Sequence, residues 1–168
     1  LTVGGSEPDK TLPELIARAK ANPGKLSYAS AGVGTTTHVA GALFAQQAKI
    51  DMQHVPYKGN GAAYNDVSGG RVTLVFTAHS SGVPYLQSGK MRALGVTSKE
   101  RMPVMADVPA IGEHVPGYSY YLWYGLFAPA GTPNEVMQKL SQALLAVQQN
   151  KAVMDRFRSE GAEAPAMN

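Results

Sequence analysis

Apolar and polar positions follow two different periods in turn over the first hundred residues. Runs with the period of a strand are separated by stretches in which apolar residues recur at helical spacing. The expected strands are residues 26–30, 51–57, 72–77 and 91–97. Of the helices expected between them, one begins behind the threonines 35–37, and two others lie near 62–67 and 83–87. This alternation predicts an α/β fold with a mostly parallel sheet flanked by helices.

Capping-box patterns mark the start of two further helices. Thr11 and Glu14 open one of them before the first of these strands, and residues 131–135, GTPNE, open another beyond a proline-punctuated connection. A last helix is expected at about 151–160. The aromatic stretch 118–130 is strand-like. Because no strand separates the last two helices, we predict that they belong to a second body.

Composition narrows the classes of function. The 168 residues are 44% hydrophobic and 16% charged, which is typical of a folded globular chain, and the net charge is only +3. Lys and Arg never form a run of three, so the sequence predicts no nucleic-acid partner. The lack of cysteine excludes disulfides, thiolate metal sites and a cysteine nucleophile. The four histidines lack metal-ligand spacing, and we expect neither a metal nor a cofactor.

A glycine-rich turn at residues 31–34 joins the first expected strand to the helix behind the threonines. Such a helix start presents unpaired backbone N–H groups and the positive end of the helix dipole, which suit a carboxylate or a phosphate. No Lys follows the last glycine, as a Walker A loop requires, and Thr37 stands where a dinucleotide fingerprint needs its third glycine. Two interpretations stay open: an anion cradle built from the N–H groups of 34–37 and the threonine hydroxyls, or a well-capped helix.

Two other loops, at residues 57–59 and 77–81, also follow expected strands. Ligands bind outside the carboxyl ends of the strands in open α/β sheets, so three loops at one edge favour a binding site. Catalytic patterns are weak, because the sequence contains neither G-x-S-x-G nor H-E-x-x-H. A hydrolase that uses Ser80 and His79 is the weaker alternative.

Four segments of the sequence carry a family resemblance. They are KANPGKLSYASAGVGTTTHVAGALF (20–44), HVPYKGNGAAYNDVSGGRVTLVF (54–76), GKMRALGVTSKERMPVMADVPAIGE (89–113) and WYGLFAPAGTPNEV (123–136). In this order and spacing they resemble the Bug family, the extracytoplasmic solute receptors of tripartite tricarboxylate transporters. The resemblance covers nearly the whole chain, and we expect a fragment without the family's N-terminal half-lobe and its C-terminal end.

The resemblance implies a type II periplasmic-binding-protein fold, in which two lobes hold the ligand in the cleft between them. Residues 6–122 are then expected to form a complete second lobe, and residues 1–5 and 123–168 to form pieces of the first, as crossover strands and C-terminal helices. Exposed apolar surface on these pieces predicts self-association of the chain.

The function implied by the resemblance is a non-catalytic receptor in the periplasm. Its ligand is expected to be a small mono-, di- or tricarboxylate or an amino acid, and its partners are expected to be the membrane subunits of the transporter. A ligand-sensing regulatory domain of the same fold is the alternative from another class.

Carried over by position, the ligand contacts are expected from the loops 30–38, 57–59 and 77–81. The expected ligand-binding residues are Ser30, Ala31, Gly32, Gly34, Thr35, Thr36, Thr37, His38, Tyr57, Lys58, Gly59, Ala78, His79 and Ser80. Family members often carry an Asn, a small residue and a Pro in the third loop, whereas this sequence has AHSS at 78–81. His79 is therefore expected to add a donor or a pH-sensitive contact.

Overall fold

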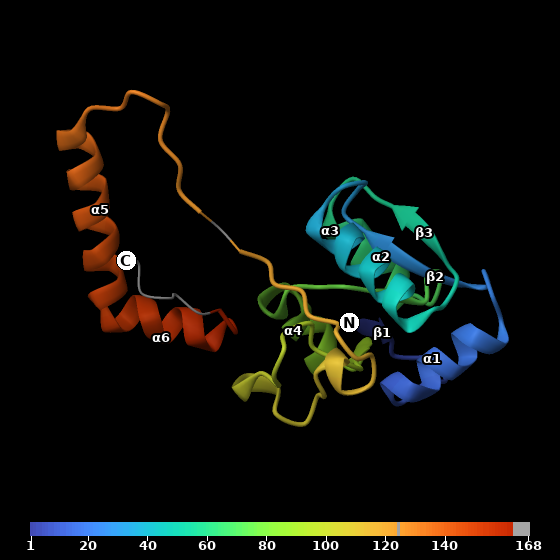
Figure 1. The fold of residues 1–168 in the computed structure, drawn as a ribbon. Coiled ribbons are helices and arrows are strands. Elements are labelled where there is room, and N and C mark those ends of the chain that lie inside the picture. The colour runs from blue at the N-terminus through green and yellow to red at the C-terminus, as the bar shows by residue number, and fades with distance from the viewer. Residues whose placement is uncertain (124, 163–168) are drawn as a thin grey trace. The chain divides into compact units, whose positions relative to one another are not determined.

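The computed structural model describes residues 1–123 and 125–162 (Figure 1). Its contacts divide the chain into two compact units, Leu1–Leu122 and Trp123–Asn168. Residue 124 and residues 163–168, which belong to the predicted second piece, lie outside the described residues.

A five-stranded sheet forms the centre of the first unit, with the strand order β3-β2-β4-β1-β5. The strands are β1 (Thr2–Gly4), β2 (Leu26–Ser30), β3 (Met52–Pro56), β4 (Leu74–Val75) and β5 (Met91–Ala93). β2 pairs in parallel with β3 and β4, whereas β1 lies between β4 and β5 and is antiparallel to both. The predicted mostly parallel sheet is confirmed, and β1 is its antiparallel member.

Four α-helices alternate with these strands, as Figure 1 shows. They are α1 (Leu12–Ala21), α2 (Thr36–Ala48), α3 (Asn60–Ser68) and α4 (His79–Gln87). Two short 3₁₀ helices follow, at Pro103–Met105 and Ile111–Glu113.

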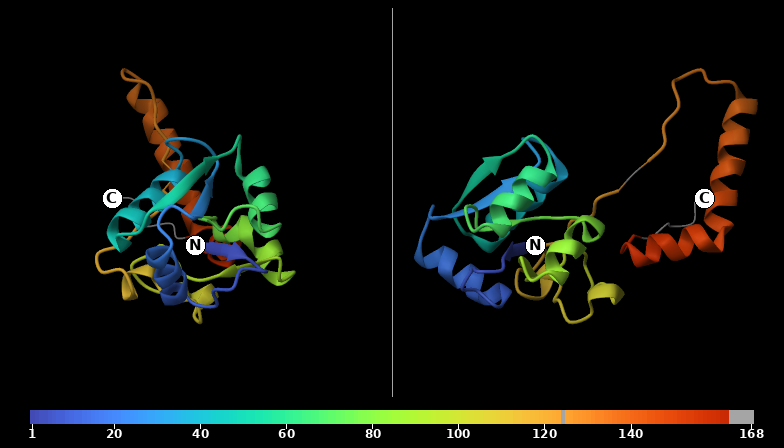
Figure 2. Two further views of the ribbon diagram at one scale, coloured as in Figure 1. Left: turned by 90° about the vertical axis from the view of Figure 1, so that its right-hand side faces the viewer. Right: turned by 180° about the vertical axis from the view of Figure 1, so that it is seen from behind.

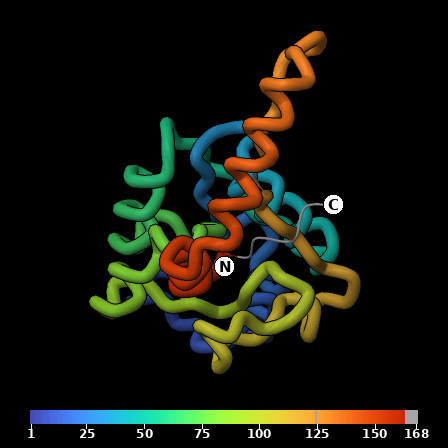
Figure 3. The backbone as a smooth tube through the Cα atoms, turned by 90° about the vertical axis from the view of Figure 1, so that its left-hand side faces the viewer, coloured from blue at the N-terminus to red at the C-terminus, as the bar shows by residue number. Residues whose placement is uncertain are grey.

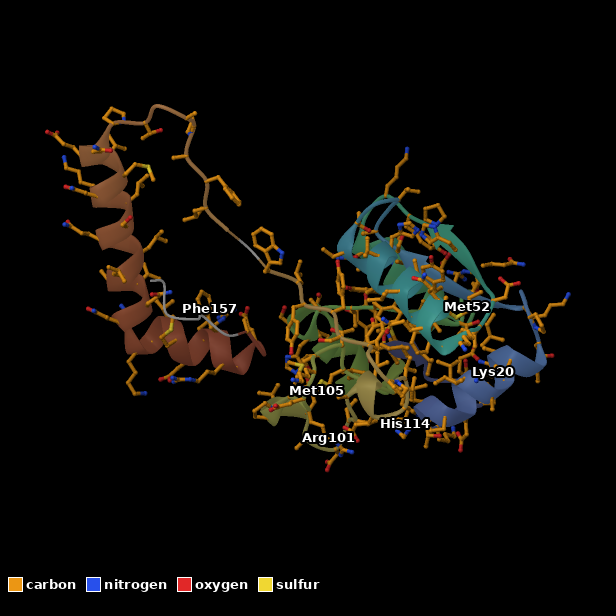
Figure 4. The ribbon with its side chains drawn as sticks, in the orientation of Figure 1. Lys20, Met52, Arg101, Met105, His114 and Phe157 are labelled. Carbon is orange, nitrogen blue, oxygen red and sulfur yellow. The ribbon has the colours of Figure 1, made fainter. Side chains whose placement is uncertain are left out.

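Helices cover both faces of the sheet, as the two views in Figure 2 show. One core packs α1 and α2 against alternate strand residues such as Tyr28 and Leu74. Met52 of β3, labelled in Figure 4, packs against this core. The other core packs α3 and α4 against Ala29 and Val75, which are the next residues after Tyr28 and Leu74 in β2 and β4. Successive strand residues therefore face opposite cores, as the pleat requires.

The start of α1 has the predicted capping box. Thr11 Oγ1 accepts a hydrogen bond from the Glu14 N–H at 3.4 Å, and the Glu14 carboxylate accepts from the Thr11 N–H at 3.2 Å. The N–H groups of Thr11 and Glu14 are satisfied in this way, and Pro13 between them has no N–H to satisfy. Local sequence therefore determines where α1 begins.

Two predicted strands are shorter than their apolar runs. The run 72–77 contributes only Leu74–Val75 to the sheet, and the run 91–97 contributes Met91–Ala93 and a single bridge between Val96 and Ala110. Their remaining apolar residues are buried by packing against the helices without ladder pairing. An apolar run therefore predicted burial better than it predicted strand length.

Residues 1–5, which the sequence assigned to the other lobe, lie in the sheet of the first unit. β1 occupies an interior position, and its Val3 is fully buried. The Leu1 nitrogen donates to the Gly95 carbonyl at 2.7 Å. How the chain divides between the lobes of a longer receptor stays a prediction.

The aromatic stretch 118–130 forms no strand in its described residues, contrary to expectation. Tyr118 is buried in the first core, and the Tyr120 N–H donates to the Thr97 carbonyl at 2.8 Å. The described residues of 123–130 are exposed, and Phe127 reaches 84%. These described residues join no strand of the five-stranded sheet.

The second unit holds α5 (Asn134–Gln149) and α6 (Lys151–Ser159), which can be followed in Figure 3. The capping box predicted at 131–135 is wrong: Pro133 is the N-cap, and the Thr132 hydroxyl donates to the Pro129 carbonyl instead. Neither helix has a buried residue, and Leu140 and Phe157 (Figure 4) are among the exposed apolar side chains. The predicted self-association through this surface stays a prediction.

Candidate functional site

Three loops leave the sheet at one edge. β3, β2 and β4 are neighbours that run in the same direction, so their carboxyl ends meet there. We call the loops 30–38, 57–59 and 77–81 together the loop edge. The first two are joined directly, because the Tyr57 N–H donates to the Ser30 carbonyl at 2.9 Å and the Gly59 N–H donates to the Ala31 carbonyl at 3.1 Å. The structure thus brings the predicted loops to one edge.

The helices that begin at the loop edge lack side-chain caps. The N-cap residues of α2, α3 and α4 are Thr35, Gly59 and Ala78, and none of them makes a side-chain cap hydrogen bond. The first N–H groups of a helix have no acceptor within the helix. Three helix starts therefore present backbone donors and positive dipole ends at the same edge of the sheet.

The threonine hydroxyls stabilise the first loop from within. Thr35 Oγ1 donates to the Gly32 carbonyl at 2.7 Å, and Thr37 Oγ1 accepts from the Ala31 N–H at 2.9 Å. These two hydroxyls lie 3.1 Å apart. Thr36, at the first position of α2, is exposed. The expectation that the hydroxyls cap α2 is therefore wrong for Thr35, whose side chain holds the turn.

Ser30 is fully buried beneath the first loop. Its hydroxyl donates to the Gly32 carbonyl and accepts from the Gly32 N–H, each at 3.1 Å. His54 Nε2 of β3 lies 2.6 Å from the same hydroxyl. The sequence did not predict this pair, since only the sheet register brings β3 beside β2 at this position. A buried hydroxyl with these partners positions the loop and is not exposed to a substrate.

His38 reaches back from α2 to the turn before it. Its Nδ1 accepts a hydrogen bond from the Gly34 N–H at 3.1 Å, so a donor expected to be free for a ligand is paired. The ring stacks on that of His54, with centroids 4.1 Å apart. Burial, and then the neighbouring His38, lower the pKa of His54. The two imidazoles form a stack with Tyr28, which lies 4.9 Å from His54 between ring centroids.

The second loop is held by residues that sequence reasoning missed. The Tyr57 hydroxyl donates to Asp66 of α3 at 2.7 Å, and Asp66 also forms an ion pair with Arg71. Burial and then the bond to Asp66 raise the pKa of Tyr57 to about 12. Lys58, which lies between Tyr57 and Gly59 in the loop, is exposed. The signal in the sequence that could have indicated this contact is a Tyr and an Asp nine residues apart, on either side of a helix start.

The third loop is shorter than predicted, because α4 already begins at His79. The predicted loop residues His79 and Ser80 therefore occupy its first turn. His79 Nδ1 is buried without a hydrogen-bond partner, and Ser80 is exposed. The Thr77 hydroxyl donates to the Tyr64 hydroxyl at 2.6 Å, which ties this loop to α3. The Ser–His pair in hydrogen-bond contact is thus Ser30 and His54.

Other kinds of site find no support in residues 1–123 and 125–162. No group of three or more His, Cys, Asp or Glu side chains could hold a metal ion there. No helix in this described part is both long enough and apolar enough to cross a membrane. One hollow of about 340 Å³ lies away from the loop edge and is lined in part by Arg101 and His114, both labelled in Figure 4.

The sequence matches, over residues 1–168, the family model described as tripartite tricarboxylate transporter family receptor. The chain belongs to this family. A UPF0065 protein of a Pseudomonas species is a 40% identical relative over 146 residues, which cover 86% of this chain and 42% of the relative. The chain thus spans less than half the length of this relative. The resemblance noted in the sequence is confirmed.

Solved structures of receptors in this family share the fold. Rpa4515 of Rhodopseudomonas palustris, solved with adipate, has a TM-score of 0.89 at 32% identity over 96% of this chain and 55% of that one. The periplasmic binding protein BugD has a TM-score of 0.86 at 32% identity, over 96% of this chain and 55% of the BugD chain. MatC of R. palustris, solved with bound malate, has a TM-score of 0.84 at 31% identity, over 95% of this chain and 55% of the MatC chain. The fold is that of periplasmic solute-binding proteins.

Proposed function

We propose that the chain is part of a receptor that captures a small carboxylate at the loop edge. The observation that carries the proposal is the set of three neighbouring helix starts without side-chain caps. Each helix dipole contributes ~0.3–1 kcal/mol to the binding of an anion, and each hydrogen bond to a charged group contributes ~1.5–3 kcal/mol. Backbone donors of this kind suit carboxylates, which accept several hydrogen bonds at once.

Open space next to two glycines supports the approach of a ligand to the backbone. Gly34 and Gly59 have φ angles of 80° and 109°, a region that favours glycine. A Cβ added to either would meet no heavy atom within 4 Å, so neither glycine is needed for internal packing. We infer that the two turns leave the N–H groups of the helix starts behind them accessible to a carboxylate.

The chemistry of the relatives agrees with this class of ligand. Adipate and malate, named with the two Rhodopseudomonas palustris structures, are both dicarboxylates. A second carboxylate needs a second set of donors, and we infer that the opposing lobe of the receptor supplies it across an interlobe cleft. Closure on the ligand in the periplasm then presents the loaded receptor to the membrane subunits. This role is non-catalytic.

A thermal-shift screen of the full-length protein tests the proposal. Malate and adipate are each compared with the corresponding diamide, which keeps the shape and removes the charge. We expect the acids to raise the melting temperature and the diamides to have no effect. Stabilisation by the diamides, or by neutral and cationic solutes alone, would refute an anion site.

Two matched threonine variants then test the role of the hydroxyls. Thr36→Val alters an exposed side chain, whereas Thr37→Val removes the acceptor of the Ala31 N–H and leaves that donor unpaired. We expect Thr37→Val to lower both stability and carboxylate affinity, and Thr36→Val to lower affinity alone. Unchanged affinity in Thr36→Val would show that its hydroxyl does not contact the ligand.

A further inference from the structure

His38 occupies the third position of α2, and Glu14 occupies the same position of α1. The Glu14 carboxylate accepts from the N–H groups of Lys10 at 2.7 Å and of Thr11 at 3.2 Å, four and three residues before it. His38 Nδ1 accepts from the Gly34 N–H, also four residues before it. The two side chains therefore perform the same back-capping contact with different chemical groups.

The difference between the two groups is their range of titration. A carboxylate accepts hydrogen bonds at any pH well above 4, whereas an imidazole nitrogen accepts only in its neutral form and ordinarily gains a proton near pH 6.5. A protonated ring carries an N–H at Nδ1, which cannot pair with the Gly34 N–H. Two donors would then point at one position, and a carboxylate oxygen is a group that satisfies both.

The described surroundings of the ring supply no counter-ion for its charged form. Tyr28 of β2 and His54 of β3 are the titratable groups that stack with it, and neither supplies a negative charge at neutral pH. No ion pair involves His38 in the described part of the chain. The positive end of the α2 dipole also disfavours a cation in its first turn. An arriving carboxylate reverses this balance.

We propose that His38 couples carboxylate capture to proton uptake: its neutral ring holds the Gly34 N–H in the free protein, and its protonated ring and that N–H together bind the ligand. The inference rests on the proposed function, because it assigns the carboxylate to the donors of the loop edge. Affinity then rises as the pH falls through the titration of the imidazole, since the complex binds more protons than the free protein.

Calorimetric titration of the full-length protein at pH 6.5 and pH 8.5 tests the coupling. The probe is whichever of malate and adipate gives the larger thermal shift, as both are almost fully ionised in this range. We expect affinity to fall about tenfold from the lower to the higher pH, within the limit of tenfold per pH unit that a single proton sets. Binding of equal strength at both pH values would overturn the inference.

Three variants identify the residue responsible. His38→Asn keeps an acceptor that does not titrate, and we expect it to bind equally at both pH values. His114→Gln is a matched control outside the loop edge and should keep the wild-type pH dependence. Loss of that dependence in His54→Gln but not in His38→Asn would overturn the inference. A wild-type pH dependence in His38→Asn would overturn the inference. Lack of probe binding at either pH in the wild type would refute the proposed function and the inference with it.

Nuclear magnetic resonance of the ligand-free protein gives a test that needs no ligand. The geometry requires the neutral His38 ring to carry its proton at Nε2, because Nδ1 is the acceptor. We expect that tautomer, and a Gly34 amide shift that follows the titration of His38. A ring protonated at Nδ1, or a Gly34 amide that does not respond, would overturn the inference whatever the ligand screen shows.

Discussion

At Gly41, α2 packs closely against Tyr28 of the sheet. A Cβ added there would lie 2.4 Å from Cδ2 and 2.5 Å from Cε2 of Tyr28. Carbon atoms normally approach to ~3.5–4.0 Å, so the ring or the helix would have to move by more than ~1 Å. Tyr28 is only 4% exposed and stacks on His54, which leaves the ring little room to move.

We expect Gly41→Ala to destabilise the fold relative to a matched alanine substitution. Overpacking of this kind costs ~1–3 kcal/mol, whereas the helix propensity of alanine contributes about 1 kcal/mol in its favour. Gly61 also lies in a helix, and a Cβ there meets no atom within 4 Å. Gly61→Ala therefore carries a similar propensity gain without the clash, and the difference between the variants measures the contact.

Urea unfolding followed by circular dichroism measures that difference. We expect Gly41→Ala to be less stable than Gly61→Ala by ~1–3 kcal/mol, which corresponds to about 3–9 °C in melting temperature. Shortening Tyr28 to Val in the Gly41→Ala background should recover part of the loss, as a double-mutant cycle would show. Equal stability of the two alanine variants would refute the packing argument.

Three other predictions concern caps and titrating groups. Thr11→Ala removes the α1 cap and should cost about 1 kcal/mol in urea unfolding; an unchanged midpoint would contradict the capping role. Tyr57→Phe removes the hydrogen bond to Asp66 and should lower the free energy of unfolding by about 1 kcal/mol. In an ultraviolet titration, the same variant should lack the phenol with a pKa of about 12. Glu113 accepts hydrogen bonds from Arg101 and from the Ala110 N–H, and these bonds lower its pKa from 4.5 to about 2. The stabilisation that Glu113 gives the folded state is therefore present above pH ~4.5 and is lost as the pH falls towards 2. Melting temperatures of Arg101→Gln should therefore fall less than those of the wild type on acidification, and parallel curves would argue against the pair.

Local pattern was sufficient for the elements whose signals lie within a few residues. The capping box at Thr11 predicted the start of α1, and the strand 26–30 was predicted within its observed bounds. The alternation of strands and helices also indicated that loops 30–38 and 57–59 leave the same edge of the sheet. These predictions succeed because periodicity and end-capping are properties of neighbouring residues.

Contacts at the loop edge could not be predicted in the same way. His54 meets Ser30 only because β3 pairs with β2 in one particular register, and a shift of one residue would turn its ring to the other face. Sequence reasoning assigned the Gly34 N–H to a ligand, whereas the structure pairs it with His38. It also placed His79 in a loop, although α4 begins there.

The sequence by itself determined the family and the alternating α/β pattern, and it predicted an anion site at the turn of residues 31–34. Only the tertiary structure decided that β1 enters the sheet between β4 and β5, and that three uncapped helix starts share one edge with a pair of stacked histidines. The physical reason is that pattern records the period of a segment and the solvation of each residue, whereas strand register and close packing depend on partners distant in the chain.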